Sequence, residues 1–432
     1  MNDARVKLWG RVIGAVSWIE ERGIGVFQYD PEFATSGIQV SPLMMPLNEF
    51  PFEFPALAKV TFKGLPGLLA DSLPDKFGNA IIDTWLASQA RNPESFNPVE
   101  RLCYIGTRGM GALEFEPAIS SPFSKDRKLE LEQLVVLVNK IFEQKSGMQG
   151  FLTGEDDKEV LEDILKVGTS AGGARAKAIL AWNPNTNEFR SGQMELEQGF
   201  EHWLLKFDGI SNNRDKEIAD PQGYGKIEFA YYQIARNAGI TMMESRLHHE
   251  GGRSHFMTRR FDRMETGGKI HMQTLGAMAH YDYNLAGMYS YEQAIHVIRR
   301  LGLSRADLEQ QVLRTIFNVV GRNQDDHVKN IAFLMDRRGN WSLSPAYDVI
   351  YSWNPTGAWT GLHQMSVNNK RDHFIREDLI ALAKTAGIKK ATAEDMIDIV
   401  ITEFKKWNEI ASGAGIEPES MDKIGKSLRL NL

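Results

Sequence analysis

The stretch NQDDHVKNIAFLMDRRGNWSLSPAYDVI, residues 323–350, begins with polar and charged side chains and continues as two apolar runs around a turn. The runs IAFLM and WSLSP have strand length, and the five-residue turn DRRGN between them contains Gly339, which indicates a hairpin. If one strand runs outward and the other returns, Asp348 comes back close to Asn330. The sequence therefore predicts that Asp325, Asn330 and Asp348 gather at one end of a two-stranded ribbon.

These three side chains suit phosphoryl transfer. That reaction uses one carboxylate to orient and deprotonate the attacking hydroxyl, and an Asn/Asp pair to hold magnesium on the nucleotide phosphates. The Asp325-x4-Asn330 spacing equals the catalytic-loop spacing of protein kinases. The same spacing occurs in solvated loops, His327 is also compatible with a hydrogen-bonded structural histidine, and Asp326 with a surface charge. The returning Asp348 favours the kinase interpretation.

Further kinase-like features lie upstream. The loop VGTSAGGARAKAIL (167–180) is rich in Gly, Ala and Ser, so its amides could approach phosphates closely. It matches neither common phosphate-loop pattern and is also typical of a flexible turn. Lys206 lies in HWLLKF, a predicted strand, and Glu228 lies on a helix predicted over 226–240. Kinases pair such a lysine with such a glutamate, although a solvated lysine and an exposed glutamate give the same pattern.

Composition limits the class of protein. The chain has 432 residues, 42% hydrophobic and 25% charged, as in ordinary globular proteins. A formal charge of -6 and a pI near 6.0 argue against a free-standing nucleic-acid binder, because phosphate neutralisation needs a basic surface. A single cysteine, Cys103, excludes an internal disulfide and a cysteine metal cluster. With no signal-peptide pattern and no apolar run of about 18 residues, we expect a soluble cytoplasmic protein without a membrane partner.

The first part of the chain is expected to be β-rich. The runs VKLWGRVIGAVSW, GIGVFQY, IQVSPLMM and AKVTF predict a small antiparallel sheet up to about residue 63. A helix is predicted after Pro74, and RGMGALEF (108–115) turns into another strand. The Pro/Ser stretch PAISSPFS (117–124) suits a boundary. We therefore expect a β-rich module over residues 1–122.

The remainder is expected to form two further domains. Residues 123–262 hold a predicted helix over 127–144, the glycine loop and the Lys206 strand. Helices dominate residues 263–432, among them one that begins at a Ser304/Asp307 capping pair and others over 376–388 and 392–407.

The order of these features resembles the HipA family, the kinase toxins of HipA/HipB-type toxin–antitoxin modules. The resemblance rests on GLLADSLPDKFG, GALEF, SAGGARAK, the Lys206 strand, RRFDR, DDHVKN and PAYDVI, and it covers most of the chain. It implies an α+β fold of two lobes, like that of protein kinases and phosphoinositide kinases, with an added N-terminal β module.

The resemblance also implies roles for particular residues. Asp325 would be the catalytic base, Asn330 and Asp348 the magnesium ligands, and Ser170 an autophosphorylated serine. The residues expected around ATP are Gly172, Gly173, Ala174, Arg175, Ala176, Lys177, Lys206, Glu228, Arg259, Arg260, Phe261, His327, Val328, Lys329, Asn330, Tyr347 and Asp348. Two departures stand out: the loop reads GARAK where the family commonly has GAQEK, and Arg259 replaces an acidic residue usual at the hinge.

The expected activity is transfer of the ATP γ-phosphate to Ser/Thr of a protein, such as a translation component, with ATP and Mg2+ as cofactors. The expected partners are a HipB-like helix-turn-helix antitoxin and, mainly through that antitoxin, operator DNA. A lipid or small-molecule kinase is one alternative, because Asp325-x-His327-x-x-Asn330 also resembles the catalytic loop of phosphoinositide kinases. A catalytically silent corepressor is the non-enzymatic alternative.

Overall fold

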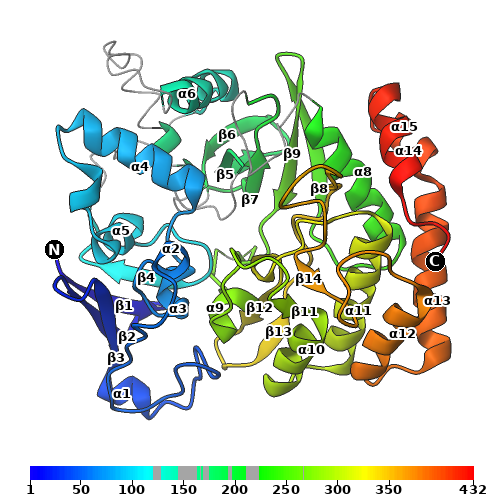
Figure 1. The fold of residues 1–432 in the computed structure, drawn as a ribbon. Helices are drawn as coiled ribbons and strands as arrows, with labels where there is room; N and C mark the ends of the chain where they lie inside the picture. Colours follow the sequence, from blue (N-terminus) through cyan, green and yellow to red (C-terminus); the bar gives the residue numbers. More distant parts are fainter. Residues whose placement is uncertain are drawn as a thin grey trace.

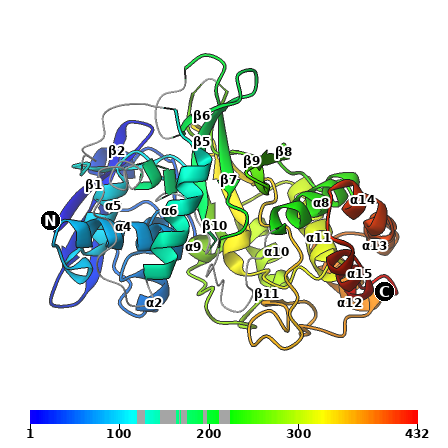
Figure 2. The same cartoon turned by 90° about the horizontal axis from the view of Figure 1, so that it is seen from above.

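The computed structural model describes residues 1–119, 128–144, 163–165, 167–168, 175–192, 197–210, 223–265 and 267–432. Figure 1 shows a β-containing N-terminal region in blue to cyan, the central five-stranded sheet mainly in green and a mainly helical region in yellow-green to red. Seen from above, the five-stranded sheet lies between the other two regions (Figure 2). We call these parts the N-terminal region (1–119), the central sheet and the helical region (263–432).

The N-terminal region is built on a four-stranded antiparallel sheet of order β3-β2-β1-β4. Its strands are β1 (Asp3–Leu8), β2 (Arg11–Ile19), β3 (Ile24–Tyr29) and β4 (Leu113–Glu116). Alternate residues of β1 are buried, as expected when one face of a sheet packs on a core. The predicted small antiparallel sheet and the strand in RGMGALEF are confirmed.

Two expected strands of this region are wrong. The AKVTF run forms a single helical turn, α2 (Lys59–Phe62), closed by a hydrogen bond from the Lys63 backbone N–H to the Lys59 carbonyl oxygen. IQVSPLMM makes only an isolated bridge between Ser41 and Met45. The edge of β3 instead exchanges backbone hydrogen bonds with Phe52. The backbone groups of residues 59–62 form hydrogen bonds within their own helical turn, so they need no neighbouring strand.

Helices complete the N-terminal region: α1 (Pro31–Ala34), α3 (Gly67–Ala70), α4 (Lys76–Ser88), η1 (Pro93–Ser95) and α5 (Pro98–Ile105). Asp75 is the N-cap of α4, because its Oδ1 accepts the backbone N–H groups of Phe77 (3.1 Å) and Gly78 (3.5 Å). The helix predicted after Pro74 is confirmed.

The central sheet is antiparallel throughout and has the order β6-β5-β7-β9-β8. Its strands are β5 (Lys177–Asn183), β6 (Glu188–Ser191), β7 (Glu201–Lys206), β8 (Ser245–Glu250) and β9 (Arg253–Arg259). Lys177 and Lys206 are directly opposite each other in the β5–β7 pairing, so their side chains leave the sheet on the same face. Helix α8 (Tyr224–Asn237) packs against β8 and β9, and α6 (Leu131–Gln144) packs against α4.

The helical region contains α9 (Leu275–Ala279), α10 (Tyr291–Arg300), α11 (Arg305–Val320), α12 (Arg376–Thr385), α13 (Lys390–Lys405), α14 (Trp407–Gly413) and α15 (Pro418–Ser427). Ser304 and Asp307 form the predicted capping box of α11, since each side chain accepts the other's backbone N–H. The helices predicted over 376–388 and 392–407 correspond to α12 and α13.

The predicted hairpin is present in the helical region. Strand β12 (Ala332–Met335) pairs antiparallel with β13 (Trp341–Leu343), and β10 (His271–Thr274) adds a third strand beside β12. Gly339 takes the left-handed backbone conformation (φ 85°) that the turn requires. A separate two-stranded pairing joins β11 (Tyr289–Ser290) to β14 (Met365–Ser366).

Three buried apolar clusters hold these elements together. One fills the space between the N-terminal sheet and α5, a second joins α4 and α6 to the central sheet, and a third joins α8 to the helices of the helical region. Helix α4 thus packs on the central sheet and carries its first residues toward β5. No helix within the described parts of the chain is long and apolar enough to cross a membrane.

Candidate active site

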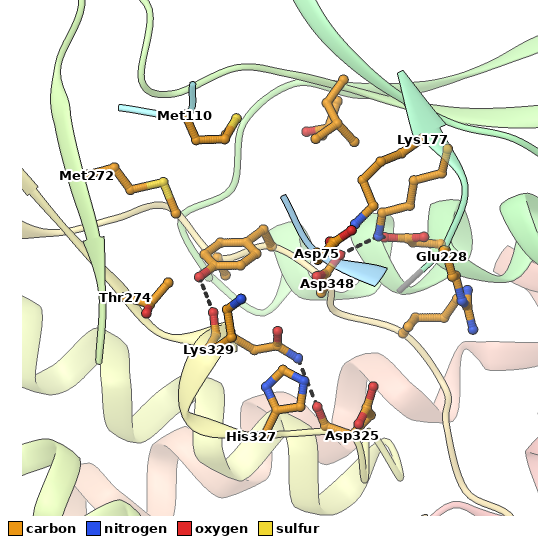
Figure 3. Close-up of a pocket in the computed structure, with 18 of the residues that line it drawn as sticks. Asp75, Met110, Lys177, Glu228, Met272, Thr274, Asp325, His327, Lys329 and Asp348 are labelled. Carbon is orange, nitrogen blue, oxygen red and sulfur yellow. Dashed lines mark hydrogen bonds and ion pairs between the residues drawn. The ribbon is translucent and has the colours of Figure 1, made fainter. Parts of the chain in front are cut away.

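A cavity of about 360 Å3 lies where the three regions meet. The N-terminal region contributes Asp71 and Asp75, the central sheet contributes Lys177 and Lys206, and the helical region contributes residues of the 323–350 stretch. Figure 3 shows side chains from all three regions around the cavity, among them Asp75, Lys177 and Asp348. Segments far apart in sequence therefore share one charged site.

Lys206, at the end of β7, holds two carboxylates together. Its Nζ lies 2.5 Å from Oε1 of Glu228 on α8 and 2.5 Å from Oδ1 of Asp348. Burial disfavours the ammonium, but the charges of Asp348 and Glu228 outweigh it and raise the pKa of Lys206. Burial likewise disfavours the Asp348 carboxylate, but Lys206 and Lys177 outweigh it and lower its pKa. The predicted pairing of Lys206 with Glu228 is confirmed.

Asp348 has an unusual backbone. Its φ of 52° lies in the left-handed region, which costs a non-glycine residue conformational energy. Its carbonyl oxygen accepts a hydrogen bond from Asn323 Nδ2 at 3.4 Å, and its carboxylate is held by Lys206. Such backbone strain persists where surrounding contacts fix a functional group in place.

Lys177 and Asp75 are oppositely charged groups of the cavity that influence each other electrostatically. Burial raises the pKa of Asp75 to about 6, and the ammonium of Lys177 is the strongest group opposing that rise. Burial lowers the pKa of Lys177, which Asp348 and Asp75 oppose. Asp75 Oδ1 caps α4, whereas its buried Oδ2 has no hydrogen-bond partner within the described residues. Figure 3 shows both side chains in the same part of the cavity.

The loop from Asp325 to Asn330 ends in the short helix η2 (Val328–Asn330). Asn330 Nδ2 donates a hydrogen bond to the carbonyl oxygen of Asp325 (2.8 Å), and the backbone N–H of His327 donates to the same oxygen (3.0 Å). The Lys329 ammonium lies 5.0 Å from the ring centre of Tyr283. The hairpin that follows brings Asp348 back to this loop, as the sequence predicts.

Asp326 is no surface charge. Its side chain is 1% exposed and accepts hydrogen bonds from Tyr291 Oη (2.7 Å), the His363 ring (Nδ1, 2.7 Å) and the Gln364 backbone N–H (2.7 Å). The two neighbouring aspartates therefore differ. Asp325 lines the cavity, whereas Asp326 points into the protein interior and holds the loop through buried hydrogen bonds.

The segment from Arg259 to Phe261 begins at the last residue of β9 and lines the cavity. The Arg260 guanidinium is buried in an ion pair with Asp262 (2.7 Å) and does not project as a free cation. The Phe261 ring lies 5.7 Å from that of Tyr347, whose hydroxyl donates to the Lys329 carbonyl oxygen at 2.6 Å. Phe261 and Tyr347 thus form an aromatic wall.

The structure brings most of the expected site residues to the cavity. Those lining it are Arg175, Lys177, Lys206, Glu228, Arg259, Arg260, Phe261, Asp325, His327, Lys329, Asn330, Tyr347 and Asp348. The side chains of Ala176 and Val328 do not line it, because both are buried in apolar cores. Ser170 and the loop residues Gly172, Gly173 and Ala174 lie outside the described residues.

Several lining residues were not expected from the sequence. Asp71 accepts hydrogen bonds from the Thr274 backbone N–H (2.7 Å) and hydroxyl (2.8 Å), and Asp75 faces Lys177. Four methionines also line the cavity: Met110, Met242, Met243 and Met272. GLLADSLPDKFG contains both aspartates, but nothing in its pattern indicates that they face a site built mainly by later residues.

The oxygen groups of Asn330 and Asp348 fit magnesium. The described residues contain no group of three or more His, Cys, Asp or Glu arranged to hold a metal. Mg2+ in nucleotide sites needs only one or two carboxylates, with waters and substrate phosphates completing its shell. Asn330 donates a hydrogen bond to the Asp325 carbonyl oxygen through Nδ2, so its Oδ1 is not used in that bond. One carboxylate and one amide oxygen are a suitable donor set.

The fold is mixed α/β, with a charged cavity where its three regions meet. Two family models match the chain: the HipA-like C-terminal domain over residues 169–408 and the HipA N-terminal domain over residues 4–116. The first covers more than half of the chain, and the chain belongs to the HipA family. No curated protein matches it.

A solved structure has the same fold. The chain is similar to a chain of the Shewanella oneidensis MR-1 toxin–antitoxin complex of HipA, HipB and operator DNA, with a TM-score of 0.65, 16% identity, and coverage of 98% of this chain and 94% of that one. It also matches the Helicobacter pylori proinflammatory kinase CtkA, with a TM-score of 0.32, 9% identity, and coverage of 53% and 88%. We draw nothing from the second match, because so low a TM-score does not define a common fold.

Proposed function

We propose that this chain is a two-lobed, ATP-dependent serine/threonine protein kinase. The observation that carries the proposal is Lys206, which holds both Glu228 and Asp348 at 2.5 Å in a cavity that Asp325 also lines. A lysine paired with a helix glutamate and an acid beside an Asp-x4-Asn loop are the groups that kinases assemble around ATP. The central sheet with α8 forms one lobe and the helical region the other.

Each group has a task in this proposal. Lys206 and Lys177 offset phosphate charge, and Asp325 orients the attacking hydroxyl and accepts its proton. Phe261 and the methionines supply an apolar wall for the adenine ring. Asn330 and Asp348 hold Mg2+, which when bound neutralises charge on the β- and γ-phosphates.

Binding of Mg·ATP tests the site directly. Calorimetry should show ATP affinity that depends on magnesium, and Asp348→Asn should weaken it by tenfold or more, because a charged oxygen ligand is lost. Unchanged Mg·ATP affinity in a folded Asp348→Asn protein would remove Asp348 as a ligand. ADP release from Mg·ATP then tests phosphoryl transfer.

We also infer that the chain works in a toxin–antitoxin module and acts on a protein, such as a translation component. Membership of the HipA family supports a HipB-like helix-turn-helix antitoxin as partner. The formal charge of -6 favours operator binding mainly through that antitoxin. Gel shifts should show strong operator binding by the complex and weak binding by the chain alone. Equal binding by both would refute this.

Ser170 is the proposed site of autophosphorylation. A phosphate there adds about -1.5 to -2 charge next to the loop expected to cradle ATP, and so should repel the nucleotide. Mass spectrometry after incubation with Mg·ATP, followed by calorimetry of the modified form, tests both steps. No phosphate at Ser170, or unchanged ATP affinity after phosphorylation, would end this part of the proposal.

The alternatives fit the site less well. A silent corepressor has no use for the close, charged arrangement of Lys206, Glu228 and Asp348. A lipid kinase would need a membrane-facing surface, whereas the proposed acceptor is a protein hydroxyl. Phosphorylation of vesicle lipids but not of proteins would favour the lipid kinase.

A further inference from the structure

A tryptophan outside the cavity holds the carboxylate of Asp325. Trp359 Nε1 donates a hydrogen bond to Asp325 Oδ1 at 2.6 Å. Trp359 is absent from the cavity lining and follows Asp325 by 34 positions. Hydrogen bonds to ionised acceptors are about twice as strong as neutral ones, so this bond restricts rotation of the carboxylate.

The loop that carries Trp359 is closed upon itself. The Gly361 backbone N–H donates to the Gly357 carbonyl oxygen (3.1 Å), and the Asn354 N–H donates to the Thr360 carbonyl oxygen (3.3 Å). A Cβ atom at Gly361 would lie only 2.4 Å from the Gly357 oxygen, so the turn excludes any larger residue there. Residues 354–361 therefore form a compact loop with a defined shape.

Two glutamines fix the backbone of this loop at Trp359 and at the next residue, Thr360. Gln364 Nε2 donates to the Trp359 carbonyl oxygen (2.5 Å), and Gln324 Nε2 donates to the Thr360 carbonyl oxygen (3.1 Å). Gln324 immediately precedes Asp325, so the same stretch of chain presents the acid and anchors the loop that restrains it. Both glutamines are buried, which strengthens such bonds.

The chain just after the loop is bonded to Asp326 through His363. Arg429 Nη1 lies 3.1 Å from His363 Nε2, and an arginine can only donate, so Nε2 is the acceptor and Nδ1 carries the proton. His363 Nδ1 therefore donates to Asp326 Oδ2 (2.7 Å). Arg429 also donates to Asp372 Oδ1 (2.5 Å). This chain of bonds joins Asp326 to His363, two positions after the loop that carries Trp359, and to Arg429.

We propose that Trp359 is a positioning residue, whose indole N–H fixes the Asp325 carboxylate in the orientation needed to receive the acceptor hydroxyl. The inference rests on the proposed function, because it takes Asp325 as the base. Trp359 acts through Asp325 and not on ATP, so its loss should slow the chemical step and leave nucleotide binding intact. Misplacing a catalytic group by about 1 Å costs on the order of 100-fold in rate.

The experiment compares four variants of the full chain. Trp359→Phe removes the N–H, and replacement of Trp359 by benzothienylalanine removes it while keeping the ring size. Trp353→Phe is the matched control, because Trp353 precedes the same closed loop and stacks on Arg322 (4.4 Å) instead of bonding to Asp325. Asp325→Ala reports on the base itself. The readouts are Mg·ATP affinity by calorimetry and kcat for ADP release from Mg·ATP.

We expect both Trp359 variants to bind Mg·ATP within twofold of wild type while kcat falls by about 10- to 100-fold. Trp353→Phe should match wild type in both. Wild-type kcat in the benzothienylalanine variant, with Asp325→Ala inactive, would overturn the role of Trp359 and leave the proposed function standing. A loss that follows ATP affinity and not kcat would also overturn it. Wild-type ADP release by Asp325→Ala would remove the base and both proposals with it.

Discussion

Lys206 Nζ and Asp348 Oδ1 lie 2.5 Å apart although 142 positions separate them in the sequence. The pair joins the end of β7 in the central sheet to Asp348, which lies in the helical region shortly after the β12–β13 hairpin. Glu228 completes it from α8, at 2.5 Å from the same ammonium. A single lysine thus holds two parts of the fold in one arrangement.

Replacing this lysine should cost both stability and binding. Lys206→Met leaves the Glu228 carboxylate (side chain 4% exposed) and the partly exposed Asp348 carboxylate (29%) without their shared counter-charge. We expect the free energy of unfolding to fall by about 3–5 kcal/mol and Mg·ATP affinity to be lost. Denaturant titration and calorimetry measure these changes.

Lys426→Met is the control for that variant. Its Nζ lies 2.6 Å from Asp422 Oδ2, but the two side chains are 76% and 61% exposed, so water screens the pair. Its unfolding free energy should change by less than about 1 kcal/mol. Wild-type stability and affinity in Lys206→Met would show that the buried pair is not needed.

The neighbouring aspartates 325 and 326 should respond oppositely to alanine. Asp325→Ala is expected to keep the fold and to lose about 100-fold or more in ADP release, because the base is removed. Asp326→Ala should lower the free energy of unfolding by about 3 kcal/mol or more, since Tyr291, His363 and Gln364 lose a buried acceptor. Denaturant titrations of both variants, with ADP release measured on each folded protein, separate the two roles. Equal destabilisation by both would contradict the division.

Asp75 predicts a pH dependence of stability. Burial raises its pKa from 3.8 to about 6, so the folded protein holds this proton over a pH range in which the unfolded chain has released it. A state that binds more protons loses stability as pH rises. The contribution of Asp75 to stability should therefore fall between about pH 4 and pH 7.

Asp75→Asn removes this titration but keeps an N-cap acceptor for α4. The difference in free energy of unfolding, variant minus wild type, should increase by about 1–3 kcal/mol as pH rises from about 4 to about 7. Above that window the difference should stay constant. Asp30→Asn, at the N-cap of α1 and outside the cavity, controls for the cap exchange. Parallel pH curves for wild type and Asp75→Asn in nucleotide-free protein would contradict the prediction.

Gly361→Ala should lower kcat as the Trp359 variants do, but through a steric effect on the loop. Gly361→Ala places its Cβ 2.4 Å from the Gly357 carbonyl oxygen, so the 354–361 loop must shift and carry Trp359 with it. We expect kcat for ADP release to fall by about tenfold or more with Mg·ATP affinity retained. Gly413→Ala, where an added Cβ meets nothing within 4 Å, is the matched control. Equal kcat in the two glycine variants would show that the loop shape is unimportant.

Local patterns determined much of the fold. The hairpin after Asn330 follows from two short apolar runs around Gly339, and the start of α11 follows from the Ser304/Asp307 cap, because both depend on residues within a few positions of each other. Local pattern misjudged AKVTF, whose β-type residues form a helical turn. A strand forms only where another strand accepts its hydrogen bonds, and the sequence of the segment alone does not show whether such a partner is present.

The same distinction applies to the site. The sequence by itself brought Asp325, Asn330 and Asp348 together, since one short hairpin connects them. It also placed Lys206 on a strand and Glu228 on a helix, the positions at which kinases pair a lysine with a glutamate. Only the tertiary structure decided that Asp75 faces Lys177 and that Trp359 holds Asp325. Those contacts join separate regions or distant loops, and they depend on how α4 packs on the central sheet and how residues 354–361 close. Packing between distant segments produces no local periodicity in the chain. The sequence therefore does not show which residues these side chains contact.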